Sequence, residues 1–120
     1  MGKRLHSAVS YEVKYGEKEY FNWQADRINP IIDILAEGDT SYNDDDIQFA
    51  DTISANRENL LANIDKIINP DENWEYQDDL ERKLRNIGLV GLTREELHKE
   101  LKTLIEQADS RIGYVHFAWY

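Results

Sequence analysis

The chain of 120 residues contains no cysteine, only two prolines and one methionine. The lack of cysteine excludes disulfides, thiolate zinc sites and a cysteine nucleophile, and it fits a reducing compartment. No run of residues approaches the ~20 apolar positions that a membrane helix needs. The N-terminal residues MGKRLHSAVSYEV also lack the apolar stretch of a signal peptide. We therefore expect a soluble, cytoplasmic protein.

Catalytic signatures are missing as well. There is no GxSxG nucleophile elbow, and the glycines at 88 and 91 lack the GK[ST] ending of a phosphate-binding loop. Paired carboxylates are uninformative in a chain with 24 acidic residues. His6, His98 and His116 show no spacing that places two metal ligands on one helical turn. His6 and His116 meet only if the terminal strands pair, and ordinary sheet histidines are the favoured interpretation. We expect no catalysis, cofactor or metal site.

A calcium site is the one metal alternative that the sequence suggests. The loop beginning at Asp39 offers oxygen ligands at positions one, three and five. A calcium-binding helix–loop–helix also needs glycine at position six and glutamate at position twelve, where this chain has Asp44 and Ala50. A solvated loop is therefore favoured over a weak divalent-ion site among Asp44, Asp45 and Asp46.

Basic residues are scarce in the middle third of the chain. Residues 37–81 hold fourteen acidic and two basic residues, a net charge of −12, whereas the whole chain carries −10. An acidic chain is unsuited to direct nucleic-acid binding or to an anionic membrane surface, because both need Lys and Arg. The acidity is compatible with a basic protein partner, a bound cation or solubility alone.

The two ends of the chain have the pattern of β-strands. Residues 5–15 alternate with period two, with Leu5, Val9 and Val13 on one face, and residues 114–120 alternate again. Gly16 is a turn residue, and residues 17–21 form either a short return strand or an extended lead-in to a helix. Because a terminal HFAWY segment would aggregate if left exposed, we expect the first and last strands to pair.

Helical periodicity fills the middle of the chain. Residues 25–35 form a helix that either begins with Pro30 at its first position or bends there. A long helix is expected from Asp45, with Gln48 completing a capping box, to the Asn69–Pro70 stop. Two more are expected over 76–87, closed by Gly88, and over 93–108, opened by a capping box. The sequence thus predicts one α+β domain over 1–120, with a small antiparallel sheet from the two ends covered by about four helices.

The acidic residues of the middle third have two interpretations. They are the solvated faces and caps of helices, which charge runs usually are, or they form a surface that binds a partner. Two clusters without basic residues, the first within residues 37–51 and the second within 71–81, favour the second interpretation, each with aromatic side chains of the kind that anchor interfaces. If the helices that carry them pack antiparallel, the clusters lie at opposite ends and together form an extended acidic surface. Trp74 is equally expected to cover the core. The predicted partner-binding residues are Asp39, Tyr42, Asp44, Asp45, Asp46, Asp51, Trp74, Glu75, Tyr76, Asp78 and Asp79.

These patterns predict a small acidic protein-binding module without catalysis. It would inhibit a partner by occupying a basic surface, such as that of a nuclease or another nucleic-acid-binding protein. Nuclease immunity proteins and nucleic-acid-mimicking anti-defence proteins act in this way, and the analogy rests only on charge, size and lack of cysteine. The alternative is a structural or assembly protein that self-associates through its terminal strands. A homodimer is compatible with either function.

Overall fold

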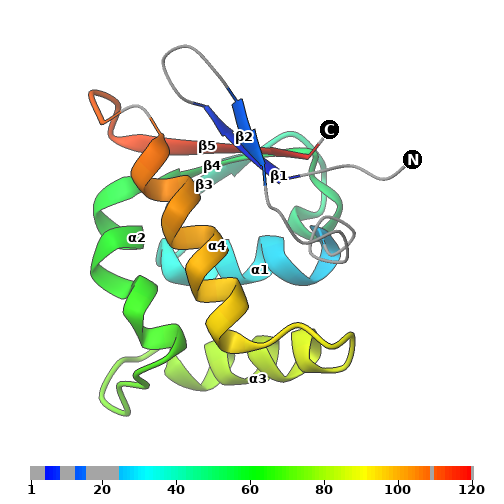
Figure 1. Ribbon diagram of the computed structural model, residues 1–120, viewed down its shortest axis with the longest axis vertical. Coiled ribbons are helices and arrows are strands. Elements are labelled where there is room, and N and C mark those ends of the chain that lie inside the picture. Colours follow the sequence, from blue (N-terminus) through cyan, green and yellow to red (C-terminus); the bar gives the residue numbers. More distant parts are fainter. Residues whose placement is uncertain (1–4, 9–12, 16–24, 109, 120) are drawn as a thin grey trace.

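The computed structural model describes residues 5–8, 13–15, 25–108 and 110–119. Figure 1 shows a twisted antiparallel sheet with all of the helices on one side of it. Helix α1 lies between the sheet and α3, and α2 and α4 flank it. In chain order the elements are β1 (Leu5–Ala8), β2 (Val13–Tyr15), α1 (Ala25–Leu35), β3 (Thr40–Tyr42), the 3-10 helix η2 (Ile47–Phe49), β4 (Thr52–Asn56), α2 (Arg57–Asn63), the 3-10 helix η3 (Ile64–Ile67), α3 (Gln77–Gly88), α4 (Arg94–Gln107) and β5 (Tyr114–Trp119).

The sheet joins the two ends of the chain, as the sequence predicts. Its strand order is β2-β1-β5-β4-β3, and Ser7 of β1 pairs with Phe117 of β5. The α+β class is therefore confirmed. β5 is paired along residues 114–118 by β4 and along residues 117–119 by β1, so within the described residues it lies inside the sheet. The sheet also contains two strands from the middle of the chain, which the sequence analysis did not assign.

The prediction of one continuous strand over 5–15 is wrong. β1 and β2 pair antiparallel, with His6 opposite Tyr15, so the alternating stretch folds back on itself. Alternation of polar and apolar residues continues across a hairpin, which is why it did not reveal the break. The expectations for Gly16, for residues 17–21 and for Tyr120 lie outside the described residues.

The prediction of one long helix over 45–69 is also wrong. η2, β4, α2 and η3 occupy this range, and the helical run begins only at Arg57, with Asn56 as its N-cap. Ile47 and Ile53 fit the spacing of a helical stripe, but they belong to separate elements that face the same core. The burial of β4 alternates, and its threonine and isoleucine favour a strand. The predicted stop at Asn69–Pro70 agrees with the end of η3.

The other predicted helices are present. α1 continues through Pro30, so the longer of the two proposed helices is the one that forms. α3 ends at Gly88, and α4 begins with the predicted capping box, in which Thr93 and Glu96 bond each other's backbone N–H groups. α1 ends with Glu37 at a φ of 55°, a left-handed conformation that closes the helix through the Gly38 N–H to Asp33 O bond.

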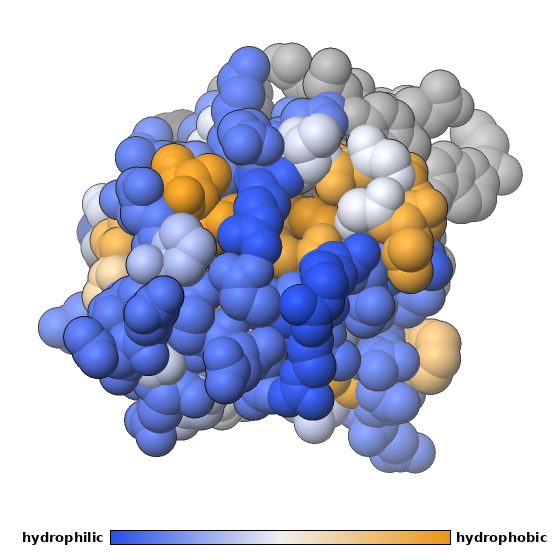
Figure 2. All heavy atoms as spheres, turned by 90° about the horizontal axis from the view of Figure 1, so that it is seen from below, coloured by the Kyte–Doolittle hydropathy of each residue, from blue (hydrophilic) through white to orange (hydrophobic). Residues whose placement is uncertain are grey.

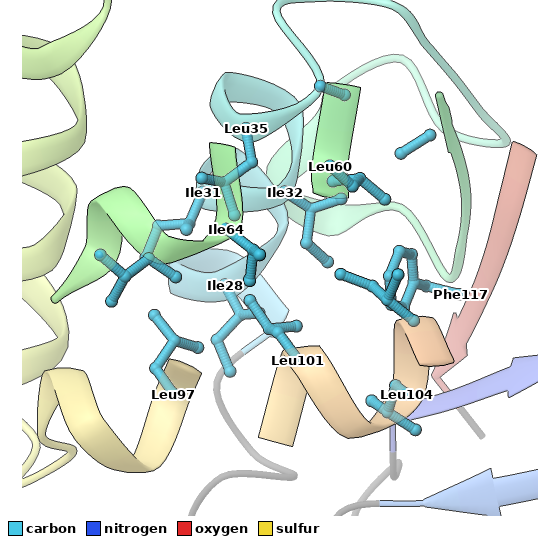
Figure 3. Close-up of a cluster of buried hydrophobic side chains, with 14 of the residues drawn as sticks. Ile28, Ile31, Ile32, Leu35, Leu60, Ile64, Leu97, Leu101, Leu104 and Phe117 are labelled. Atoms are coloured by element: carbon cyan, nitrogen blue, oxygen red, sulfur yellow. The ribbon is translucent and has the colours of Figure 1, made fainter. Parts of the chain in front are cut away.

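The hydrophobic core surrounds α1. Figure 3 shows the α1 side chains of Ile28, Ile31, Ile32 and Leu35 among residues of α4, α2, η3 and β5. All four are fully buried, as is Phe117 of β5. Asn29 of α1 is polar and also fully buried, so its side chain needs hydrogen-bond partners inside the protein. It finds them in the loop between β3 and β4.

Candidate functional site

The first acidic cluster lies on the β3–β4 hairpin rather than on a helix. Residues 39–56 contain five aspartates and no Lys, Arg or His, a net charge of −5. All five aspartates are exposed. Two aromatic side chains of the same segment are exposed as well, Tyr42 by 42% and Phe49 by 63%. We call residues 39–56 the acidic hairpin. In Figure 1 the loop that connects its two strands lies near the N-terminal end of α1, whereas its base follows the C-terminal end.

The connection between the strands is held by short polar side chains. The carboxamide oxygen of Asn43 accepts hydrogen bonds from the backbone N–H groups of Asp51 and Thr52, at 2.9 and 3.0 Å. Asp46, not Asp45, caps the following 3-10 helix by accepting the N–H of Gln48 at 3.0 Å. Such bonds replace the hydrogen bonds that a loop would otherwise make to water, and they fix its conformation.

Asn29 ties the acidic hairpin to the core. Its side-chain nitrogen donates to the carbonyl oxygens of Ile47 and Ala50, at 3.1 and 3.0 Å. A buried amide at hydrogen-bonding distance from two carbonyls satisfies groups that water does not reach. The acidic hairpin is therefore preorganised by a residue of α1.

Asp39 accepts two hydrogen bonds at the base of the hairpin. One of its carboxylate oxygens accepts a hydrogen bond from the Tyr114 hydroxyl at 2.9 Å, and the other accepts from the Asn56 amide at 2.8 Å. The bond to Asp39 raises the pKa of Tyr114 above its ordinary value, because the carboxylate stabilises the protonated phenol. Asp39 therefore holds strands together and is the least available of the five for a partner.

The second cluster surrounds the start of α3, and its aromatic residues are partly buried. Trp74 packs against the hydrophobic core, and Lys66 Nζ lies 5.0 Å from its ring centroid. Tyr76 meets Trp74 edge to face, with centroids 5.5 Å apart. Of the two sequence interpretations of Trp74, a cover over the core is the one this packing supports.

The acids of the second cluster differ in their surroundings. Asp79 forms an ion pair with Arg82, whereas Glu75 and Asp78 are exposed and have no ion pair among the described residues. Asp45 of the acidic hairpin is in the same situation. The predicted site residues thus fall into two groups, those with local partners and those that face only solvent within the described part of the chain.

A neighbouring network explains why Glu81 is not part of this surface. Its carboxylate pairs with the guanidinium of Arg94 and accepts from the Gln77 amide at 3.0 Å. The hydrogen bond from Arg94 lowers the pKa of Glu81 below its ordinary value. Arg94 also donates to the Ile67 carbonyl at 3.3 Å, so the network joins η3, α3 and α4.

The two clusters lie far apart on the molecule. In Figure 1 the connecting loop of the acidic hairpin, with Asp44, Asp45 and Asp46, lies toward one end of α1, and the turn that leads into α3 lies toward the other. The expected acidic surface along two antiparallel helices is not formed, because residues 45–56 contain the short 3-10 helix η2 and the strand β4 in place of the first half of a long helix. The sequence predicted the two clusters and their separation, but not the elements that carry the first.

Phe49 and Leu89 are exposed apolar residues that the sequence analysis missed, Leu89 by 79%. Phe49 was missed because the predicted long helix over 45–69 did not place it on the apolar face. Leu89 follows the glycine that ends α3, where an apolar residue commonly packs back on the helix, so its exposure could not be expected from the sequence.

His98 and His116 each contact one polar side chain and not a metal-ligating cluster within the described residues. His116 Nδ1 lies 2.6 Å from the Ser54 hydroxyl on the neighbouring strand, and His98 Nε2 lies 2.8 Å from Asp65. The hydrogen bond from His98 lowers the pKa of Asp65. No group of three or more His, Asp or Glu side chains suited to a metal ion occurs within residues 5–8, 13–15, 25–108 and 110–119.

Comparison with protein-family models, with curated proteins and with solved structures finds no match to this chain. Among the described helices, none combines the length and the apolar character needed to cross a lipid bilayer.

Proposed function

We propose that this chain is a non-catalytic binding module that docks its acidic hairpin onto a basic surface of another protein. The observation that carries the proposal is the combination of five exposed aspartates, no basic residue and two exposed aromatic rings within one anchored hairpin. Exposed like charges repel one another and oppose folding, so their concentration on a fixed hairpin favours a binding role.

The mechanism has two steps. The negative field of the acidic hairpin steers a positively charged partner, which raises the association rate at low salt. Phe49 and Tyr42 then bury apolar surface at the centre of the contact, as aromatic anchors do in other interfaces. Since the hairpin is already held by Asn29 and Asn43, little ordering entropy is lost on binding.

The class of partner follows from this chemistry. Clusters of Lys and Arg on protein surfaces are most often built to bind nucleic-acid phosphates, so a nuclease or other nucleic-acid-binding protein is the proposed partner, and inhibition the proposed outcome. Direct binding to nucleic acid is not part of the proposal, because the hairpin would repel phosphates.

The test is capture of partners from native cytosol at about 50 mM and 500 mM salt, since the Debye length falls severalfold over that range. The test variant is Asp44→Asn/Asp45→Lys/Asp46→Asn, in which asparagine keeps the loop's acceptors while the charge rises by four. Glu58→Lys/Glu106→Lys is the control, with the same charge change at exposed helical positions. The proposal expects capture by the wild type and the control at low salt only. Equal capture by the hairpin variant would overturn it.

A further inference from the structure

The exposed face of α3 has its charges separated by sign. Acids precede and begin the helix, at Glu75, Asp78 and Asp79, and bases follow, at Arg82, Lys83 and Arg85. The opposite face is buried through Leu80, Leu84 and Ile87. This face of α3 points away from the sheet and is seen head-on in Figure 2, where hydrophilic side chains cover most of it.

The charges on this face are only partly compensated within the chain. Asp79 and Arg82 pair with each other at the middle of the segment. Glu75 and Asp78 on one side, and Lys83 and Arg85 on the other, form no ion pair or hydrogen bond through their side chains within the described part of the chain. Glu75 and Arg85, the outermost of these four residues, are ten residues apart, which corresponds to ~15 Å along a helix.

A groove lies beside the basic half. It has a volume of about 620 Å³ and runs between α1 and α3, with Pro30, Asp33 and Ile34 forming its α1 wall. Asp33 already accepts a hydrogen bond from the Thr40 hydroxyl at 2.6 Å, and Asp79 is paired with Arg82. Arg82, which also lines the groove, is the partner of Asp79, and Arg85 interacts with Glu81 through its charge without an ion pair. Lys83 and Arg85 can therefore still attract acids from outside.

We propose that α3 is the docking surface for a second copy of this chain, in an antiparallel two-fold pair. A two-fold axis near residue 81 places Asp78 of each copy opposite Arg85 of the other and Glu75 opposite Asn86 at the groove, because seven and eleven residues are nearly whole numbers of helical turns. Lys83 adds positive charge at the groove. A two-fold contact is self-complementary, so one helix with an acidic half and a basic half satisfies both sides at once. Leu89 then lies near Trp74 of the other copy and adds apolar contact.

The dimer is weak and sensitive to salt. A helix of 12 residues is ~18 Å long, which is too short to bury the ~800 Å² per partner of a standard interface. The net charge of −10 on each copy opposes association at long range. We therefore expect a dissociation constant on the order of 0.1–1 mM at low salt.

The experiment is sedimentation equilibrium of the full chain from about 10 µM to 1 mM, with two charge-reversed variants. Glu75→Lys/Asp78→Lys makes the whole face basic, and Lys83→Glu/Arg85→Glu makes it acidic. We expect at least a tenfold weaker dimer for each variant alone and recovery of association in their equimolar mixture. The mixture combines two net-negative chains, so its association can only come from the local faces. The Glu58→Lys/Glu106→Lys variant has the same change in net charge as Glu75→Lys/Asp78→Lys, and because it lowers the long-range repulsion it should dimerise at least as strongly as the wild type.

Dimerisation of either single variant at wild-type strength, or a mixture that stays monomeric, would overturn the proposal. Lysine at the start of α3 opposes the helix dipole, so Glu75→Gln/Asp78→Asn serves as a milder variant if the first one unfolds. It should weaken the wild-type dimer severalfold, and an unchanged dimer would again contradict the proposal. None of these substitutions touches residues 39–56, so failure here leaves partner capture by the acidic hairpin independently testable.

Discussion

The side-chain nitrogen of Asn29 lies 3.0 Å from the carbonyl oxygen of Ala50, and this hydrogen bond connects the most buried helix to the most acidic loop. Asn29 is fully buried, so its amide has no competing water. The surface proposed to bind a partner is thereby fixed from inside the molecule.

Replacing this amide should destabilise the fold and loosen the hairpin. For Asn29→Ala we expect a loss of about 2–3 kcal/mol, since two carbonyls lose their donor and a buried acceptor remains unsatisfied. Urea unfolding measures the loss, and hydrogen exchange should quicken at the Asp51 and Thr52 amides. Asn86→Ala, at an exposed position of α3, should change stability by less than about 0.5 kcal/mol. Equal effects for the two variants would contradict the role of Asn29.

Acid should weaken the junction of α3 and α4. The pKa of Glu81 is lowered in the folded protein by its bond to Arg94, so its contribution to stability is present above the ordinary glutamate value near 4.5. That contribution is lost as the pH falls through the lower folded value. We expect Glu81→Gln to cost about 1 kcal/mol at pH 7 and to flatten the dependence of unfolding free energy on pH below about 4.5. An unchanged acid slope in this variant would contradict the assignment.

The bond between Tyr114 and Asp39 should be visible in the titration of the phenol. Because the carboxylate raises the pKa of Tyr114, Asp39→Asn should move that pKa back toward 10. NMR of ring-labelled tyrosine, with Tyr114→Phe to assign the signal, measures the shift. A Tyr114 signal that does not move would show that the bond is absent in solution.

Replacement by alanine should lower the unfolding free energy strongly at one phenylalanine and hardly at another. Phe117 is fully buried in β5, and Phe117→Ala should cost about 3–5 kcal/mol through lost burial and a cavity. Phe49 is 63% exposed, so Phe49→Ala should change the unfolding free energy by less than about 0.5 kcal/mol. Urea denaturation compares them, and partner capture should be reduced only by the second. A large stability loss at Phe49 would mean that it belongs to the core.

The sequence was informative where local chemistry and periodicity agreed. Thr93 and Glu96 have the spacing of a capping box, and they form one. It failed at Ile47 and Ile53, whose spacing fits a helix although they face one core from different elements. Periodicity records which residues face inward but not whether the chain turns between them. The acidic residues of the candidate site were predictable from composition, whereas the exposure of Phe49 depended on knowing that hairpin.

The position of β5 inside the sheet has a consequence for how the chain folds. Ser7 pairs with Phe117, more than a hundred residues away, and β4 pairs with the same strand. Until residues 114–119 have been synthesised, β1 and β4 have no strand between them and both expose an unpaired edge. The sheet therefore closes late and through a distant contact, which slows folding and leaves the nascent chain dependent on its helices for protection from aggregation.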